Sequence, residues 1–428
     1  MSQKRRGISF GTVFTLLMTI ATIGLGALIF PQLAGSLEDV QAGAAVMIQA
    51  LAATAVPPGV TPIPTLAPSP QTTATPTPTP AARSITLSFS GQVNLDSTLR
   101  KAGVRESNTY DYSDIFTQIA PYLSKADLTL VTVETVVAGD IAGFGSYNAP
   151  DAILSALRQA GVDVINVATE RILDIGITGL NATYETGKRF GFDVIGINVT
   201  PEGRYHPLIV DVKGVKTALL SYTYGLSSTG SKQGTASQRE DSVNIIDAAR
   251  IRSDVAYVRE QGAQLVIVNA HWGKRNNTKP AGEVQRLVDD IANCGVDVII
   301  GTHPTSVHPF ETRTVHLADG TEKDIFIAYS MGNLLTNERD EAKDILGSIL
   351  TLTFTQDPGS STARLTDARY MPTWVMRYQS GSYQYRILPA GTEQQPPEMT
   401  NTIYRNMRRA YEALLKQNGT QPALPVAE

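Results

Sequence analysis

The chain has 428 residues, of which 18% are charged, and its formal net charge is -4 at pH 7. No long basic run offsets this balance, so we expect no nucleic-acid partner. Cys294 is the single cysteine of the sequence, which excludes an intrachain disulfide and a zinc site built from several thiolates.

The N-terminus combines a basic tip with a long apolar stretch. The tripeptide KRR at residues 4–6 is followed by the uncharged residues 7–36, which are long enough to cross a hydrocarbon core of about 30 Å. A cleaved signal peptide is the alternative, but its apolar region usually has only about 7–15 residues. We therefore predict a cytoplasmic tip and an uncleaved transmembrane helix within residues 1–36, with the basic flank inside the cell.

Residues 37–84 contain a short helical pattern and then a stretch rich in Pro, Thr and Ala, PPGVTPIPTLAPSPQTTATPTPTPAA. Such a composition has little to bury and favours an extended, semi-rigid spacer. At about 3.1 Å per residue, a spacer over residues 55–84 would reach roughly 90 Å. The sequence thus predicts a single-pass protein of the cell membrane whose globular domain lies outside the cell on a stalk.

From residue 84 onward, apolar runs alternate with amphipathic segments. The predicted strands are residues 85–91, 126–134, 162–168, 192–198, 264–273, 296–303 and 324–333. The predicted helices between them are residues 149–161, 178–191, 243–262 and 282–295, each ending at a glycine. Residues 347–355, 363–378 and 382–390 alternate like antiparallel strands, and residues 401–419 form a final helix.

This alternation predicts an α/β layered fold, because strands that are apolar at consecutive positions are buried on both faces. We expect a globular domain over residues 85–395 and a C-terminal helix and tail over residues 396–428.

Polar side chains come directly after several of the predicted strands, where open α/β sheets bind ligands. Each one alone is typical of a turn or a helix cap, but together they indicate a site on one rim. These positions are Gln92, Glu134, Thr169 to Arg171, His271, His303 and Asn333.

Several segments, in order and spacing, resemble the CapA family of poly-γ-glutamate capsule synthesis proteins. They are SFSGQVNL, ADLTLVTVET, GVDVINVATERILDIG, VIVNAHWG, GVDVIIGTHPTSVHPFE and IAYSMGN, within residues 84–390. The resemblance implies a calcineurin-like metallophosphatase fold, a four-layer α/β/β/α sandwich, in an extracytoplasmic domain tied to the membrane.

The chain departs from the family pattern at several ligand positions. Gln92 stands where the family has Asp, Glu170 and Arg171 replace an Asn-His pair, and Thr305 replaces the second His of His-Pro-His. Arg275 stands where an acidic residue is expected after His271, Trp272 and Gly273. The pattern keeps Glu134, Asp174 with Gly176, His303, and Tyr329, Ser330, Gly332 and Asn333.

The residual metal ligands are therefore Glu134, His271 and His303, with Glu170 as a substitute donor. A two-metal centre needs a bridging carboxylate and several imidazoles, and a cationic Arg171 would repel an ion, so we expect no metal or one divalent ion of the manganese or zinc type. Asp96 is expected to lie beyond the rim. The other rim or substrate-binding candidates are Gln92, Glu170, Arg171, Asp174, Trp272, Arg275, Glu311, Ser330 and Asn333, with Glu311 expected to orient a histidine.

Three functions remain open at this point. The first is a non-catalytic or weakly catalytic CapA-like protein that takes part in synthesis, export or anchoring of an anionic capsule polymer, alone or with a capsule synthase complex. In it, Arg171, Lys274 and Arg275 would replace metal charge and bind carboxylate or phosphate groups. The second is an active metal-dependent phosphoesterase or hydrolase of an envelope polymer. The third is a structural domain whose rim has lost its chemistry.

Overall fold

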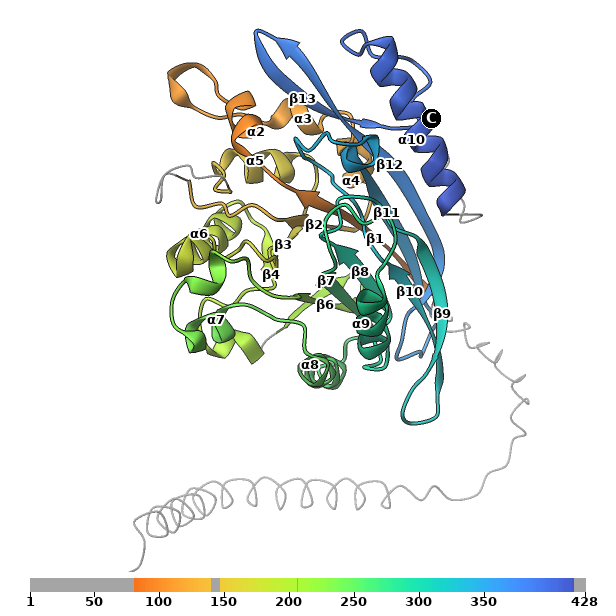
Figure 1. Cartoon of the computed structure of the whole chain (residues 1–428). Helices are drawn as coiled ribbons and strands as arrows, with labels where there is room; N and C mark the ends of the chain where they lie inside the picture. Colours follow the sequence, from red (N-terminus) through yellow and green to blue (C-terminus); the bar gives the residue numbers. More distant parts are fainter. Residues whose placement is uncertain (1–80, 140–146, 206, 419–428) are drawn as a thin grey trace, which may run out of the picture. The chain divides into compact units, whose positions relative to one another are not determined.

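The computed structural model describes residues 81–139, 147–205 and 207–418 (Figure 1). The chain divides into two compact units, Met1–Thr77 and Pro78–Glu428, and all described residues belong to the second. The predicted membrane anchor and nearly all of the predicted spacer lie outside the described residues. Within the described ranges, no helix has both the length and the apolar character needed to cross a bilayer.

The first of two sheets has seven strands and combines a parallel half with an antiparallel half. The neighbours β1, β2, β3 and β4 run parallel, whereas β11 pairs antiparallel with β1, and β12 and β13 continue antiparallel from it. The strand order is β13 (Ser382–Pro389), β12 (Arg364–Ser380), β11 (Leu346–Gln356), β1 (Arg83–Val93), β2 (Leu128–Val133), β3 (Val164–Asn166) and β4 (Asp193–Ile195).

The second sheet has six strands, with a parallel centre and one antiparallel strand at each edge. The order is β5 (Leu208–Val212), β6 (Val215–Thr223), β7 (Leu265–His271), β8 (Val298–Thr302), β10 (Glu322–Ala328) and β9 (Phe310–His316). Strands β6, β7, β8 and β10 are parallel, and their carboxyl ends therefore share one edge of the sheet.

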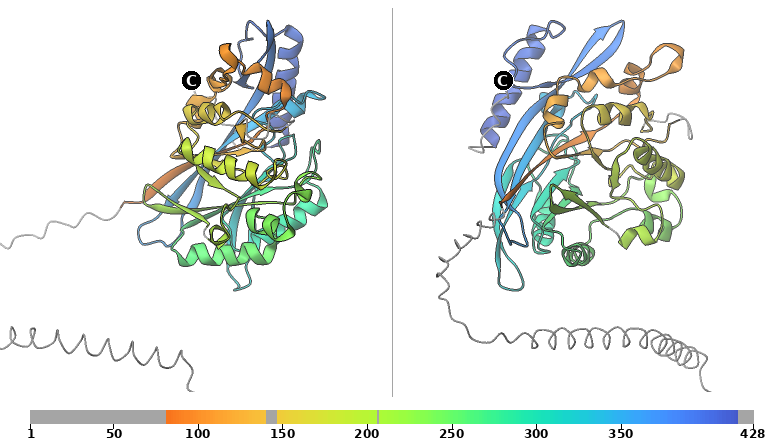
Figure 2. Two further views of the ribbon diagram at one scale, coloured as in Figure 1. Left: turned by 90° about the vertical axis from the view of Figure 1, so that its left-hand side faces the viewer. Right: turned by 180° about the vertical axis from the view of Figure 1, so that it is seen from behind.

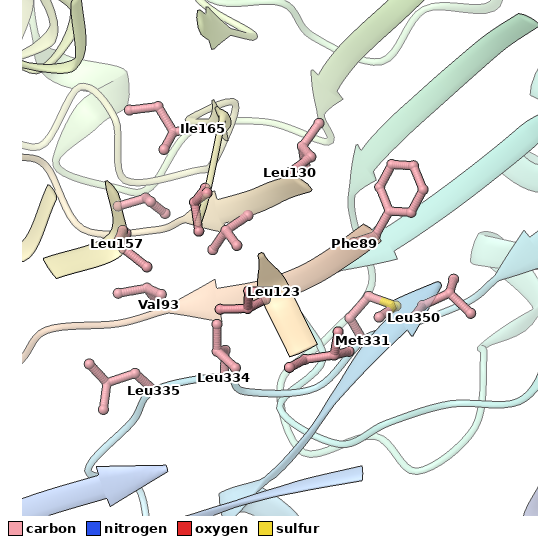
Figure 3. Close-up of a cluster of buried hydrophobic side chains, with 14 of the residues drawn as sticks. Phe89, Val93, Leu123, Leu130, Leu157, Ile165, Met331, Leu334, Leu335 and Leu350 are labelled. Atoms are coloured by element: carbon pink, nitrogen blue, oxygen red, sulfur yellow. The ribbon is translucent and has the colours of Figure 1, made fainter. Parts of the chain in front are cut away.

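Alternating side chains of the second sheet belong to two different cores. Ile267 and Ile300 pack in the same core as Phe89 of the first sheet, whose surroundings are drawn in Figure 3. Val268 and Ile299, each the neighbour of one of these residues along its strand, pack in a second core with helices α8 (Ala248–Glu260) and α9 (Gly282–Ala292). Since successive side chains of a strand point to opposite faces, the second sheet lies between the first sheet and these two helices.

The remaining helices bury their apolar residues in the core of the first sheet or lie in connections. Helices α5 (Ala152–Gln159) and α6 (Gly176–Arg189) contribute Leu157 and Leu180, and α10 (Asn401–Gln417) lies along the long strands near β12 (Figure 2). The short helices are α2 (Ser97–Ala102), α3 (Ser113–Phe116), α4 (Ala120–Leu123) and α7 (Ala236–Ser242), with the 3-10 turns Glu106–Asn108, Glu202–Tyr205, Gly230–Lys232 and Ala342–Ile345.

The structure confirms the predicted mixed α/β architecture with two sheets. Every predicted strand and helix of the globular part overlaps an element of the same type, although the predicted ranges do not include β5, β6, β9 or the short helices α2, α3, α4 and α7. Strand β6 has the sequence VKTALLSYT, in which polar residues interrupt the apolar run, yet all but Lys216 are buried.

Candidate metal centre

The predicted polar residues meet where strands from both sheets end. Glu134 directly follows β2, Glu170 lies shortly after β3, His271 is the last residue of β7, and His303 directly follows β8. All four side chains are buried. The expected rim therefore exists, and it lies at the carboxyl ends of parallel strands, the usual ligand edge of α/β sheets.

Glu170, His271 and His303 form the tightest group of ligand-type side chains at this edge. One ligand atom from each lies within 4.8 Å of the others. Oε2 of Glu170 lies 2.6 Å from Nε2 of His271 and 3.6 Å from Nδ1 of His303. A carboxylate and two imidazoles are donors that suit zinc, manganese and iron ions, so this group could hold a metal ion.

Both imidazoles are in the form that a metal ligand requires. Burial lowers the pKa of His271 to about 4, against the opposing effect of Glu134. Burial, together with His271, lowers the pKa of His303 to about 3. The rings are therefore neutral at physiological pH, and a neutral imidazole offers a nitrogen lone pair to an ion.

Neighbouring groups hold the two rings in place. Nδ1 of His271 lies 3.1 Å from the Thr302 hydroxyl, at the end of β8. The rings of His271 and His303 meet edge to face with their centroids 4.8 Å apart, and the Tyr224 ring lies 5.3 Å from that of His303. These contacts fix the ring orientation before any ligand arrives.

His303 also has an unusual backbone. Its φ angle is 96°, a left-handed value that residues with a side chain rarely adopt, and such conformations cost about 1–3 kcal/mol. Its Nδ1 atom is buried and has no hydrogen-bond partner. A strained backbone that aims an unpaired nitrogen at Glu170 is consistent with a binding role.

Arg171 occupies the neighbouring position with its positive charge turned into the site. Its Nε lies 3.1 Å from Oε1 of Glu134 and 3.5 Å from Oε1 of Glu170, and its Nη1 lies 3.3 Å from Oδ2 of Asp174. The guanidinium carbon lies 3.5 Å from the centroid of the Tyr147 ring. Three carboxylates and an aromatic face therefore surround one cation.

The electrostatics of this group are strongly coupled. Burial and the charge of Glu170 raise the pKa of Glu134 to about 7, although His271, Arg275 and Arg171 act in the opposite direction. Burial opposes the charge of Arg171, but Glu134, Glu170 and other neighbours outweigh it and raise the pKa of the guanidinium above its ordinary value. Arg171 therefore stays cationic and partly neutralises the acidic cluster.

Further polar side chains beside the Glu170, His271 and His303 group are partly unpaired and partly engaged. Glu134 Oε2, Gln92 Oε1 and Asn333 Oδ1 are buried without a hydrogen-bond partner, so donor atoms remain around the Glu170, His271 and His303 group. At the positions of the missing family ligands, however, Arg171 binds the carboxylates and Thr305 hydrogen-bonds with Asn276 and Asp344. At these two positions the side chains are therefore engaged by neighbouring residues.

Other candidate residues support the rim through hydrogen bonds. The backbone N–H of Gln92 donates to the carbonyl of Gly332 at 2.8 Å, and the Asn333 side chain donates to the carbonyl of Asp344 at 2.8 Å. The Ser330 hydroxyl donates to the carbonyl of Pro304 at 3.0 Å. These bonds join the loop after β10 to β1 and to the His303 loop.

Two candidates lie just outside the cluster. The Trp272 indole is fully buried and donates to the carbonyl of Tyr329 at 3.0 Å. Arg275 forms an ion pair with Glu338, so its charge is already compensated.

Asp174 accepts hydrogen bonds from Arg171 and from the Ser227 hydroxyl, and Ser227 N–H donates to the Glu170 carbonyl at 2.8 Å.

Glu311 and Asp96 do not join the cluster. The Glu311 carboxylate accepts hydrogen bonds from Arg313 and from the Tyr329 hydroxyl, and it forms no hydrogen bond with a histidine of the described residues, so the expected orienting role is not seen. Asp96 caps helix α2 by accepting from the N–H groups of Thr98 and Leu99, as its expected place beyond the rim implies.

The sequence interpretation missed several residues that shape the site. Tyr224 was missed because β6, which it follows, was not predicted, and Tyr147 precedes a helix rather than following a strand. Thr302 lies next to His303 at a strand end, so the pattern used for the other residues could have found it. Ser227 carries no signal in the sequence, because its loop contact with Asp174 depends on the tertiary fold.

Comparison with known proteins gives a consistent family match. The sequence pattern of the family described as "Bacterial capsule synthesis protein PGA_cap" matches residues 86–338. The chain is 25% identical over 242 residues to "Capsule biosynthesis protein CapA" of Bacillus anthracis, covering 54% of this chain and 56% of the relative. It is 24% identical over 195 residues to "PGA biosynthesis protein CapA" of Bacillus subtilis (strain 168), covering 44% and 48%. The matches thus span about half the length of these relatives.

Solved structures with partial similarity include the NAD nucleotidase NadN of Haemophilus influenzae, with a TM-score of 0.40 and 14% identity over 79% of this chain and 57% of the other. The sulfate thiohydrolase SoxB of Thermus thermophilus has a TM-score of 0.37 and 14% identity, over 77% and 60%. Because these TM-scores are low, the fold is defined by its own strand order.

Proposed function

Since the chain belongs to the bacterial capsule synthesis protein family PGA_cap, we propose that it takes part in the synthesis, export or anchoring of an anionic capsule polymer of the poly-γ-glutamate type. The matched region contains Glu134, Glu170, His271 and His303, so the family assignment and the candidate metal centre concern the same part of the chain. The names of the two relatives refer to capsule and PGA biosynthesis, and they support this proposal.

The proposed location is the outer face of the cell membrane, with a single anchor and a cytoplasmic N-terminus. The support is the basic KRR tip before the uncharged residues 7–36, followed by the Pro- and Thr-rich spacer. A protein on such a spacer could contact a polymer as it leaves the cell, with or without a capsule synthase complex as its partner.

The proposed state of the centre is one divalent ion beside a fixed guanidinium, rather than two ions. The observation that carries this proposal is the placement of Arg171, which lies 3.1 Å from Glu134 and 3.3 Å from Asp174. Two carboxylates that could otherwise bind a second ion are then engaged by a permanent cation. A second divalent ion beside this guanidinium would meet strong repulsion in a poorly solvated site.

A metal-dependent hydrolase of an envelope polymer is the second candidate, and the compact Glu170, His271 and His303 group favours it. Three protein ligands leave coordination positions free for a substrate, as in catalytic zinc sites. A bound ion would supply Lewis-acid polarisation of a carbonyl or phosphoryl oxygen. In this chain Glu170 and the two neutral imidazoles would hold the ion, and Arg171 would stabilise negative charge next to it.

Gene deletion in the source bacterium tests the proposed function. We expect loss of cell-bound anionic polymer on deletion and recovery on expression of the full-length protein. A His271→Ala variant separates the two candidates: recovery by this variant indicates a non-catalytic role, and failure despite normal protein levels indicates that the centre acts on the polymer. Unchanged cell-bound polymer after deletion would contradict the proposal.

A further inference from the structure

A cavity that lies outside the metal cluster is lined by two arginines. It has a volume of about 290 Å³, and its wall includes Arg339, Trp374, Arg377 and Ile403. Arg339 belongs to the loop after β10, Trp374 and Arg377 to β12, and Ile403 to α10. The cavity therefore lies where the loop that also carries Glu338, the partner of Arg275, meets the C-terminal helix.

The two guanidinium groups have neutral partners. Nη2 of Arg339 donates to the carbonyl of Val375 at 3.1 Å, and its Nε is buried without a partner. Nη1 of Arg377 donates to Oδ1 of Asn337 at 3.0 Å, and the group also faces the Tyr383 ring. None of the ion pairs of the described residues includes either of these two arginines.

The acidic residues of the wall do not compensate this charge. Asp340 is exposed and makes no ion pair with either arginine among the residues that the structure describes. The carboxylate of Glu341 lies 2.7 Å from Nζ of Lys343. Burial and the charge of Arg377 lower the pKa of Arg339 to about 10, as expected for two neighbouring cations with no anion between them.

We propose that this cavity binds a carboxylate group of an acidic polymer through Arg339 and Arg377. A guanidinium presents paired N–H donors that match a carboxylate, and the unpaired donors here lack an acceptor of that kind. Ile403, which is partly exposed, offers apolar surface for the methylene groups of a glutamate side chain. The choice of a carboxylate over a phosphate rests on the proposed function, whereas the anion site itself rests on the two arginines.

The shape of the surface suits a chain rather than a single anion. A neighbouring cavity of about 440 Å³ shares Glu341, Ala342 and Asn406 with the first, and its wall adds Lys343 and Arg409. The two cavities thus follow α10 in succession. A polymer with repeated carboxylates could place one at the arginine pair and continue along the helix.

Binding of a short γ-linked oligoglutamate to the purified full-length protein, measured by titration calorimetry, tests the proposal. We expect Arg377→Gln and Arg339→Gln each to weaken binding by about tenfold or more, because each removes a charged donor pair. Asp340→Asn should strengthen binding, since it removes an exposed negative charge from the cavity wall. Affinity should also fall as salt concentration rises.

Arg405→Gln is the matched control, because it removes the same charge from α10, outside the walls of both cavities. It should change the affinity by less than about twofold. Arg339 packs near the Tyr385 ring, so Arg339→Gln is interpreted only if its thermal unfolding matches that of the unmodified protein. Arg377→Lys provides a second variant that keeps the charge but loses the paired donors.

Polyphosphate of matched charge distinguishes the two anion types. Tighter binding of polyphosphate with the same dependence on the arginines would overturn the carboxylate assignment. Oligoglutamate binding that is insensitive to both Gln variants in folded protein would overturn the site itself. Neither result would contradict the proposed capsule function. That function is tested by the deletion experiment, which measures polymer on cells and not binding at this cavity.

Discussion

The guanidinium of Arg171 lies 3.1 Å from the carboxylate of Glu134, with both groups in the interior of the candidate metal centre. Glu134 is one of the few ligand-type residues that the chain keeps from the family pattern, and Arg171 stands where that pattern has a histidine. The same guanidinium also contacts Glu170 and Asp174. A side-chain cation thus compensates negative charge next to the Glu170, His271 and His303 group.

Replacing Arg171 with Met should destabilise the metal-free protein. The change leaves three carboxylates close together without a cation, and loss of one partner from a largely buried ion pair costs about 3–5 kcal/mol. Urea unfolding of the full-length protein in the presence of a chelator measures this free energy. Arg189→Met is the control, because its pair with Asp151 is exposed and should contribute less than about 1 kcal/mol. Equal losses in both variants would contradict the role given to Arg171.

Glu170→Gln should remove most of the metal affinity. Its carboxylate contacts both imidazoles, and an amide is a much weaker ligand, so we expect the dissociation constant for Mn²⁺ or Zn²⁺ to rise about a hundredfold. Calorimetric titration of the full-length protein measures the change. Glu311→Gln makes the same charge change at a residue bound to Arg313 and Tyr329, and it should leave the affinity nearly unaltered.

The imidazoles of His271 and His303 should remain neutral in mildly acidic solution. Burial lowers their pKa values to about 4 and about 3, so protonation of the folded protein occurs well below the usual range of histidine. In histidine-labelled, metal-free protein, their ring NMR signals should not move between pH 8 and about pH 5. Spectra of His271→Gln and His303→Gln variants assign the two signals. A shift centred near pH 6.5 for either ring would show that the site is more solvated than its structure implies.

Sequence patterns identified the elements of the fold because its strands are apolar on consecutive positions and its helices have one apolar face. The same patterns placed His271 and His303 on one rim, since both end parallel strands of one sheet. They could not show that Glu170 rather than Glu134 contacts both rings. Which glutamate contacts the rings depends on where the loop after β3 turns. A hydrogen bond from the N–H of Ser227, in a segment far along the chain, holds this loop.

The charge pattern was equally ambiguous in the sequence. Arg171 and Arg275 were expected to offer free positive charge to an anionic substrate, but both form ion pairs within the domain. Arg339 and Arg377, which form no ion pair with a carboxylate among the described residues, lie on a loop and an antiparallel strand that no strand-end rule selects. Which cations are compensated is a property of tertiary packing and could not be predicted from spacing.

The proposed anchor predicts a specific cellular distribution. Full-length protein should fractionate with membranes, because residues 7–36 are uncharged and long enough to span the bilayer. Protease added to intact cells should remove the globular domain, while a cytoplasmic marker stays intact. Recovery of full-length protein in the soluble fraction, or protection of the domain from protease, would be incompatible with the proposed topology.

Metal content per chain tests most directly whether the centre holds one ion. It is measured by inductively coupled plasma mass spectrometry on the full-length protein after equilibration with Mn²⁺ or Zn²⁺. We expect one ion per chain, because in the proposed state of the centre Arg171 fills the place of a second cation. The ion should be lost in Glu170→Gln. The combined variant Gln92→Asp, Arg171→His and Thr305→His should bind more metal than the unmodified protein, since it restores three ligands. Two ions bound stoichiometrically to the unmodified protein, and lost together in Glu134→Ala, would contradict the account.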